Sequence, residues 1–137
     1  MVAEWEDIAF ASDRAGRWEI YAIDLDGRHE LRLTHGGGKA PAWSPTGLLV
    51  AYQGPKGSST GDHGMNALWL VRVNGRHGRR IARNVFSPAW KPDGRALVAS
   101  RPGSGLILLG LGGEVRRRIA PGPAVDADWQ RARAAVR

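Results

Sequence analysis

Cysteine is absent from the 137 residues of the chain, so disulfides and cysteine-ligated zinc sites are excluded, and cysteine usage says nothing about the redox compartment. No apolar run approaches the roughly 18 residues of a membrane span. Residues 1–10 carry three acidic side chains and lack the basic-then-apolar pattern of a secretory signal. We therefore expect either a cytoplasmic chain or a chain from which a signal has been removed.

Lysine is scarce: of the 20 basic residues, three are lysine and the rest are arginine. The net charge of +7 suits an anionic partner. A coding bias toward arginine explains the same excess, because the arginines are spread along the whole sequence. The apolar share of 42% is enough for a core, and the length indicates a single domain over residues 1–137.

A repeated segment is the most informative feature that the chain does contain. In each copy a turn glycine is followed by an Arg-aliphatic pair and then by a tryptophan: Gly27, Arg32-Leu33 and Trp43; Gly75, Arg80-Ile81 and Trp90; Gly113, Arg118-Ile119 and Trp129. The step from the glycine to the aliphatic residue is 6 in every copy, and the step on to the tryptophan is 10, 9 and 10. The copies recur every 38 to 48 residues. A repeat period of this length indicates an array of supersecondary units that bury their apolar faces against one another.

Each copy contains four short segments with strand chemistry, separated by Gly, Pro, Asn and Asp. The expected strands are, by type, 40–44, 88–91 and 125–130; 8–12, 48–52 and 96–100; 19–25, 67–73 and 106–111; and 30–34, 79–82 and 115–119. Asp26-Gly27 and Asn74-Gly75 are two-residue hairpin signals. Four antiparallel strands per copy are typical of a β-propeller blade, so the predicted fold class is all-β.

The residues of the first copy also resemble a known family. Ser12-Asp13-Arg14-Ala15-Gly16, Asp26-Gly27, Arg32-Leu33-Thr34 and Pro41-Ala42-Trp43-Ser44-Pro45 closely resemble the repeat of TolB-like propellers, which is also similar to the propellers of prolyl-oligopeptidase-type enzymes. The third copy departs from this repeat, since Gln130-Arg131 stands where Ser-Pro is expected. The resemblance implies six blades, as most members of the family have.

The number of expected strands predicts three blades. The chain starts with the second strand of blade 1, and a strand of the first type stands alone after blade 3. Blade 1 comprises strands within 8–34 and lacks its first strand, blade 2 spans 40–82, blade 3 spans 88–119, and a lone closing strand covers 125–130. Three blades cannot close a ring, because propellers need roughly four to eight. We therefore expect a homodimer of six blades in which the closing strand completes blade 1 of the partner. The alternative is a piece of a longer propeller.

The tryptophans Trp43, Trp90 and Trp129 recur at one position of the repeat, which identifies them as packing residues and not as a stacking platform for a ligand. No catalytic set, metal site or cofactor motif is expected. Gly57-Ser58-Ser59-Thr60-Gly61 matches G-x-S-x-G, but it lies in a Gly- and Ser-rich loop without the strand and helix that a nucleophile elbow needs.

The candidate ligand-binding residues fall on loops that should open on one side of the blades and form a basic channel mouth. They are Asp13, Arg14, Arg17, His35, Lys39, Lys56, Asp62, His63 and Arg101. The first functional hypothesis is a non-catalytic scaffold that binds a protein, a peptide or a small anionic ligand at this mouth. The second is a protein that binds nucleic acid or phosphate through its arginines, and the third is the accessory propeller of a hydrolase. No membrane partner is expected.

Overall fold

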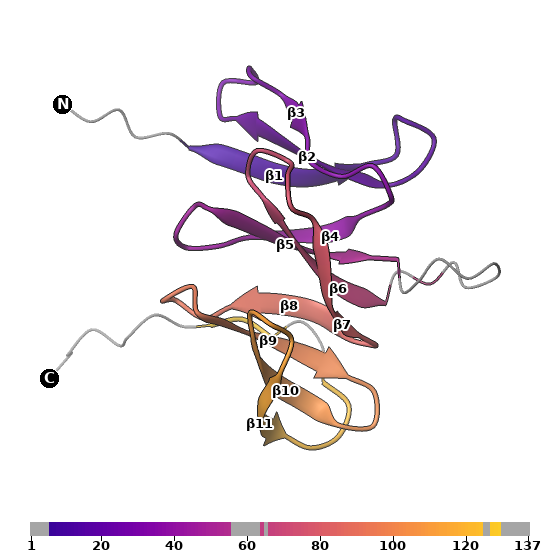
Figure 1. The fold of residues 1–137 in the computed structure, drawn as a ribbon, viewed down its shortest axis with the longest axis vertical. Coiled ribbons are helices and arrows are strands. Elements are labelled where there is room, and N and C mark those ends of the chain that lie inside the picture. Colours follow the sequence, from indigo (N-terminus) through magenta and orange to yellow (C-terminus); the bar gives the residue numbers. More distant parts are fainter. Residues whose placement is uncertain (1–5, 56–63, 65, 125–126, 130–137) are drawn as a thin grey trace, which may run out of the picture.

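A computed structural model describes residues 6–55, 64, 66–124 and 127–129 of the chain. These residues form eleven strands, shown in Figure 1: β1 (Asp7–Ser12), β2 (Glu19–Asp24), β3 (Leu31–Arg32), β4 (Lys39–Trp43), β5 (Leu49–Gly54), β6 (Ala67–Arg72), β7 (Arg79–Arg83), β8 (Phe86–Trp90), β9 (Ala96–Arg101), β10 (Gly105–Gly110) and β11 (Val115–Ala120). No helix able to cross a membrane occurs in the described part.

The strands form three antiparallel sheets in which sequence neighbours are always spatial neighbours. Blade 1 is the sheet β1-β2-β3, blade 2 is β4-β5-β6-β7, and blade 3 is β8-β9-β10-β11. The three blades lie one after another along the long axis of the molecule (Figure 1). This is the all-β arrangement that the repeat predicted.

The tight turns form where Gly follows Asp or Asn. The N–H of Gly27 bonds to the carbonyl of Asp24 at 3.0 Å, and the N–H of Gly75 bonds to Arg72 at 2.8 Å. Both glycines have a positive φ, +84° and +81°, which a residue with a Cβ adopts only at a cost. Hairpins therefore form at both expected places, but their loops are longer than the expected two residues: each glycine is the fourth residue of its turn, and Asp26 and Asn74 do not have the positive φ of a two-residue loop.

Strand β3 is shorter than the segment 30–34 expected from the sequence. It ends at Arg32 because the side chain of Thr34, and not a backbone carbonyl, accepts the N–H of Ile20 at 2.9 Å. The Thr34 hydroxyl in turn donates to the buried Glu19 carboxylate at 3.0 Å. A side-chain network therefore replaces the ladder at the point where the chain leaves blade 1.

The first strand of each complete blade carries the same irregularity. In β4 the register shifts around Ala40, and in β8 it shifts around Ser87, each three residues before the tryptophan. These residues have positive φ angles of 50° and 53°. The repeat therefore extends to backbone conformation as well as residue type.

The apolar core lies between the blades. One cluster joins blades 1 and 2 through side chains that include Ile20, Leu33, Val50 and Val71, and a second joins blades 2 and 3 through Leu68, Leu70, Leu97 and Leu109. No blade buries its apolar faces alone, as the repeat period predicted.

The closing strand expected at 125–130 falls partly outside the described residues. Of this segment the structure describes 127–129, which are not in a strand. Within the described residues, blade 1 has three strands. No described strand pairs with the outer edge of β1, whereas β4 and β8 pair with the equivalent strands β5 and β9.

Candidate binding site

The connections between strands fall on two opposite faces of the blades. We call the face of connections 13–18, 33–38, 84–85 and 102–104 the loop face, and the face of the tight turns 25–30, 44–48, 73–78, 91–95 and 111–114 the turn face. In an antiparallel meander the connections after every second strand share one side. The candidates expected at the channel mouth therefore belong to the loop face.

Arg14 lies against the side chains of its own blade. Its guanidinium pairs with Glu30 and stands over the rings of Tyr21 and Phe10, at 4.1 Å and 5.4 Å from their centroids. Its backbone N–H donates to Ser12 Oγ at 3.3 Å, and the neighbouring Asp13 carbonyl accepts the Gly16 N–H at 2.9 Å. These contacts hold the 13–18 loop in place.

Arg17 and His35 are brought together. The guanidinium of Arg17 donates to the carbonyl of His35 and its Nε lies 3.5 Å from the carboxylate of Glu19. This contact ties the β1–β2 connection to the β3–β4 connection.

Glu19 was missed by sequence reasoning, although it is a fully buried carboxylate on the loop face. It accepts hydrogen bonds from the Thr34 hydroxyl and the Gly37 N–H, and it lies 3.2 Å from the guanidinium of Arg32. The available signal was its place in the repeat, since blades 2 and 3 have Ala67 and Gly105 at the start of the same strand. A charged residue at a position where the other copies have a small residue indicates local hydrogen bonds or ion pairs.

Lys39 stands over the ring of Trp18, with its Nζ 5.0 Å from the centroid. The Trp18 carbonyl also accepts the N–H of Gly38 at 2.9 Å. Like Arg14 and Arg17, this cation is engaged within the chain.

Arg101 lies on blade 3, away from the contacts of blade 1. Its guanidinium donates one long hydrogen bond of 3.4 Å to the Arg83 carbonyl and lines a cavity of about 550 Å³. The remaining candidates, Lys56, Asp62 and His63, lie outside the described residues. The ligand-binding role of the whole candidate set stays a prediction.

Two of the three repeat tryptophans, Trp90 and Trp129, make the same interaction. The indole N–H of Trp90 donates to the Ala42 carbonyl of the preceding blade at 2.8 Å, and that of Trp129 donates to the Ala89 carbonyl at 3.1 Å. The acceptor is in each case the residue before the preceding tryptophan. No acceptor for the Trp43 indole lies in the part of the chain that the structure describes.

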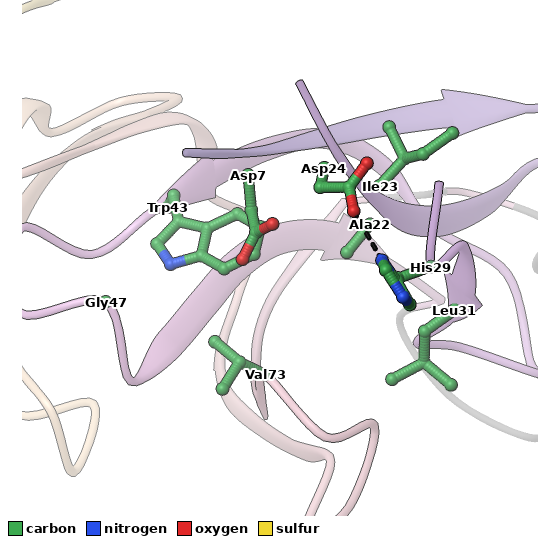
Figure 2. A pocket seen from close by; sticks show the side chains of 9 residues that line it. All are labelled: Asp7, Ala22, Ile23, Asp24, His29, Leu31, Trp43, Gly47 and Val73. Atoms are coloured by element: carbon green, nitrogen blue, oxygen red, sulfur yellow. Dashed lines mark hydrogen bonds and ion pairs between the residues drawn. The ribbon is translucent and has the colours of Figure 1, made fainter. Parts of the chain in front are cut away.

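The turn face holds a second cavity, of about 350 Å³, between blades 1 and 2. Figure 2 shows Asp24 and His29 on one side of it and Trp43 on the other. His29 Nδ1 lies 2.6 Å from the Asp24 carboxylate, and this hydrogen bond raises the pKa of His29. Hydrogen bonds from Asp26 and from His29 lower the pKa of Asp24 to about 2. The carboxylate also accepts the Arg28 N–H at 2.6 Å, so it stabilises the turn.

Comparison with solved structures defines the class of protein. The chain superimposes on TolB of Acinetobacter baumannii with a TM-score of 0.68 and 19% identity, over 90% of this chain and 35% of that one. A TolB structure from Agrobacterium tumefaciens gives a TM-score of 0.62 at 24% identity, over 85% and 48% of the two chains. The three sheets are thus arranged as propeller blades.

Curated relatives specify the repeat further. A TolB homolog of Chlorobaculum tepidum is 31% identical over 121 residues, covering 84% of this chain and 27% of the relative. The Tol-Pal system protein TolB of Anaeromyxobacter dehalogenans is 32% identical over 121 residues, covering 81% and 26%. No protein-family model matches the chain. The repeat of this chain is a TolB-like β-propeller repeat, and the chain spans about a quarter of the length of these relatives.

Proposed function

We propose that the chain is a non-catalytic protein-interaction module in which two copies, each of three blades, close into a six-bladed propeller. The names of the relatives support the first part, since they describe a component of the Tol-Pal system and no reaction. The exposed residues at the two ends of the blade array support the second.

The main support for the ring is the exposure of one apolar residue in β1, compared with the equivalent residues in β5 and β9. Val50 in blade 2 and Leu97 in blade 3 are fully buried, whereas the equivalent Ile8 in blade 1 is 45% exposed. Val50 lies opposite Trp43 and Leu97 lies opposite Trp90 in the adjoining first strand. No tryptophan strand lies beside Ile8 in the described part of the chain. By the order of the repeat, the tryptophan that belongs there is Trp129.

The indole contacts agree with this assignment. Trp129 already bonds to blade 3 as Trp90 bonds to blade 2, so it occupies the position of a tryptophan in the next blade of a ring. In a ring of two copies that next blade is blade 1 of the partner. The partner's Asp128 carbonyl then becomes the acceptor for Trp43, by the same rule that pairs Ala42 with Trp90.

The outer strands give an independent match. A Cβ on Gly75 would lie 3.4 Å from the Arg32 carbonyl, and one on Gly113 would lie 1.8 Å from the Ile81 carbonyl, so each turn packs on the outer strand of the preceding blade. Gly27 has nothing within 4 Å of its Cβ position. Ile119, the equivalent of Ile81 at the other end, is 40% exposed. Ring closure brings the Gly27 turn of one copy over Ile119 of the other.

The test is the mass of the chain in solution, measured by light scattering at micromolar concentration. We expect twice 14.8 kDa for the native chain. Ile8→Lys should dissociate the dimer, because it places an ammonium group against Trp129. Leu48→Lys is the matched control: Leu48 is 66% exposed on a turn away from the proposed seam, and its substitution should leave the mass unchanged. A native chain of 14.8 kDa would contradict the ring.

A second function is the binding of nucleic acid or another polyanion. The exposed arginines of the outer strand β11 favour it, and the cations of the expected channel mouth do not. Arg117 and Arg118 are exposed on β11 and have no ion pair within the described residues. Binding of a labelled DNA duplex that weakens steeply with salt, and that is lost in R117E/R118E, would support this function. Salt-independent or absent binding would exclude it.

A further inference from the structure

Every blade has an equivalent cross-strand pair, two residues from the loop end of its second strand. The pair is Phe10 with Tyr21 in blade 1, Tyr52 with Trp69 in blade 2, and Ala99 with Ile107 in blade 3. The two aromatic pairs have nearly the same geometry, with ring centroids 5.7 Å and 6.2 Å apart and an interplanar angle of 22° in each. Blades 1 and 2 therefore carry the same aromatic surface, and blade 3 does not.

The aromatic pair of blade 1 holds a cation of its own chain. The guanidinium of Arg14 stands 4.1 Å from the centroid of Tyr21 and 5.4 Å from that of Phe10. A cation within roughly 6 Å of a ring centroid is attracted to the negative face of the ring. The carboxylate of Glu30 pairs with the same guanidinium. Two rings and one carboxylate thus form a complete site for a guanidinium group.

The aromatic pair of blade 2 faces a cavity instead. This cavity, of about 210 Å³, lies between blades 1 and 2, and its walls include Tyr52, Trp69, Val71, Gly78 and the connection 33–37. Gly78 stands three residues after the turn glycine of its copy, as Glu30 does in the first copy. The cavity therefore occupies the place that Arg14 and Glu30 fill in blade 1.

Blade 3 shows what the repeat does when the site is absent. In place of the rings it has Ala99 and Ile107, and both are buried in one core cluster with Val85 of the connection from blade 2. Val85 lies five residues before its tryptophan, where the connection from blade 1 has Gly38. A Cβ on Gly38 would lie 3.1 Å from the Tyr52 ring, so the glycine makes room for that ring.

One polar group lies in the aromatic wall of the cavity, the hydroxyl of Tyr52. The residue is 5% exposed, and its hydroxyl forms no hydrogen bond with a described residue. A Cβ on Gly78 would lie 3.8 Å from this oxygen, which places the hydroxyl at the position equivalent to Glu30. A phenol oxygen has lone pairs that accept N–H donors. It can therefore take part of the role that Glu30 has in blade 1.

The charge around the hydroxyl favours a cation. Burial and the negative charge of the Glu19 carboxylate both raise the pKa of Tyr52. The phenol is therefore neutral, and the potential at its oxygen is negative although Glu19 is paired. The arginines that pair with Glu19, Arg17 and Arg32, reach solvent.

We propose that this cavity binds a guanidinium group from outside the chain, stacked on Tyr52 and Trp69 and donating a hydrogen bond to the Tyr52 hydroxyl. Arg14 identifies the ligand, because it occupies the equivalent place on the equivalent pair of rings. The site goes beyond the proposed function and does not depend on ring closure, since its described walls belong to one copy.

The probe is ethylguanidinium chloride at millimolar concentration, titrated into the full chain and followed by the indole N–H resonance of Trp69. This N–H donates to the Pro55 carbonyl at 3.0 Å, so it reports on the cavity wall. We expect a saturable shift, and at least tenfold weaker binding of ethylurea, which has a similar shape and no charge. The peptide acetyl-Gly-Arg-Gly-amide separates the two sources of the group. Binding at least as tight as that of ethylguanidinium points to a protein arginine, and weaker binding points to a free guanidinium compound.

Position 78 allows a gain-of-function test. Gly78→Glu supplies the carboxylate that blade 1 has at this position, and a Cβ there meets nothing closer than 3.8 Å. It should tighten ethylguanidinium binding about tenfold, the effect of a hydrogen bond to a charged group. Gly78→Gln is the matched neutral variant and should change the affinity by less than about twofold.

Two substitutions test the aromatic wall. Trp69→Leu, which gives an aliphatic residue as in blade 3, should weaken ethylguanidinium binding at least tenfold, followed here by calorimetry. Trp18→Leu is the aromatic control and should bind as the native chain does, because Trp18 contacts Lys39 and does not line the cavity.

Lys56 follows Pro55 as Arg14 follows Asp13, and it lies outside the described residues. Lys56→Gln therefore tests whether the chain supplies its own cation. Binding of ethylguanidinium to this variant and not to the native chain would overturn the proposal. Equal binding of ethylurea, or a Gly78→Glu variant that binds no more tightly than Gly78→Gln, would overturn it too, whatever the mass of the native chain.

Discussion

Glu19 shows how one buried charge fixes the exit of the chain from blade 1. The carboxylate is fully buried, yet both of its ion-pair partners reach solvent, Arg17 at 61% and Arg32 at 33% exposure of the side chain. A buried carboxylate is stable only when its oxygens are bonded, and here Thr34 and Gly37 supply two further donors. Glu19 therefore holds three segments of blade 1 in register.

We expect Glu19→Gln to lower the free energy of unfolding by about 2 kcal/mol, less than the loss for a fully buried ion pair because the arginines remain partly solvated. Arg17→Gln should lower it by less than about 1 kcal/mol, since Arg17 is mostly exposed. Urea denaturation of both variants measures the difference. Equal losses would mean that the carboxylate is no more important than its exposed partner.

Asp24 and His29 form another charged pair of blade 1, and the contribution of this pair to stability depends on pH. The pKa of Asp24 is lowered to about 2 from 3.8, so its contribution is present above about pH 4 and is lost as the pH falls toward 2. The pKa of His29 is raised above 6.5, so its contribution is present below that value and is lost as the pH rises through the raised pKa. The Asp24–His29 contact therefore contributes most between about pH 4 and pH 6.5. The Asp24–Asp26 hydrogen bond is the larger cause of the Asp24 shift and raises the pKa of Asp26, so its contribution is lost as the pH rises through that raised pKa.

Asp24→Asn should remove this dependence and bring the pKa of His29 back toward its ordinary value. The measurement is an NMR titration of His29, together with the urea midpoint of both proteins from pH 3 to pH 9. Asp93→Asn, which removes a carboxylate from a turn of blade 3, is the control. A His29 titration that is unchanged in Asp24→Asn would refute the assigned cause.

At the scale of the element, the tight turns act as spacers between blades. Gly27 and Gly113 occupy the same turn of the repeat with nearly the same φ, +84° and +88°. They differ in what an added Cβ would meet: at Gly113 it would meet the backbone of β7, and at Gly27 it would meet nothing within 4 Å. Substituting each of the two glycines by alanine therefore separates two contributions to the free energy of unfolding, that of the backbone conformation and that of blade packing.

Gly27→Ala should cost only the left-handed conformation, about 1 kcal/mol. Gly113→Ala should cost clearly more, because its Cβ would lie 1.8 Å from the Ile81 carbonyl and force blades 2 and 3 apart. Urea denaturation at low protein concentration, where the chain is monomeric, gives both values. If Gly113→Ala is no worse than Gly27→Ala, the turn does not pack on the preceding blade. In the proposed ring, Gly27→Ala would in addition weaken the association of two copies.

At the scale of the whole molecule, the two ends of the array are complementary. One end exposes Ile8 beside an unpaired strand edge, and the other carries Trp129 beyond blade 3 and an exposed Ile119. An open sheet edge and apolar side chains in solvent favour association. In the proposed ring, closure by a second copy would cover both ends at once.

Trp129→Ala should therefore act on association and on stability together. In a dimer the loss is about 3 to 5 kcal/mol, the cost of removing a buried aromatic side chain, and the midpoint of unfolding should cease to depend on protein concentration. Trp18→Ala is the aromatic control, since Trp18 is 41% exposed on the loop face. A midpoint that is independent of concentration in the native chain would contradict the dimer.

The sequence alone determined the repeat and the approximate positions of the eleven described strands, although β3 is shorter than expected and residues 127–129 of the expected closing strand are not in a strand. Turn chemistry at Asp26-Gly27 and Asn74-Gly75 and the recurrence of the tryptophans are local signals, so each could be recognised without knowing what lies nearby in space. The TolB-like character of the repeat followed from the same residues.

Only the tertiary structure decided which polar groups are engaged. Arg14, Arg17 and Lys39 were expected to be available at a channel mouth, and the structure shows them in contact with Glu30, Glu19 and Trp18. Glu19 is only two residues from Arg17. The other contacts, Arg14 with Glu30, Lys39 with Trp18 and Arg17 with the His35 carbonyl, join separate strands or connections, so no local pattern identifies them. The network around the Glu19 carboxylate depends likewise on the packing of three separate segments, which sequence periodicity does not describe.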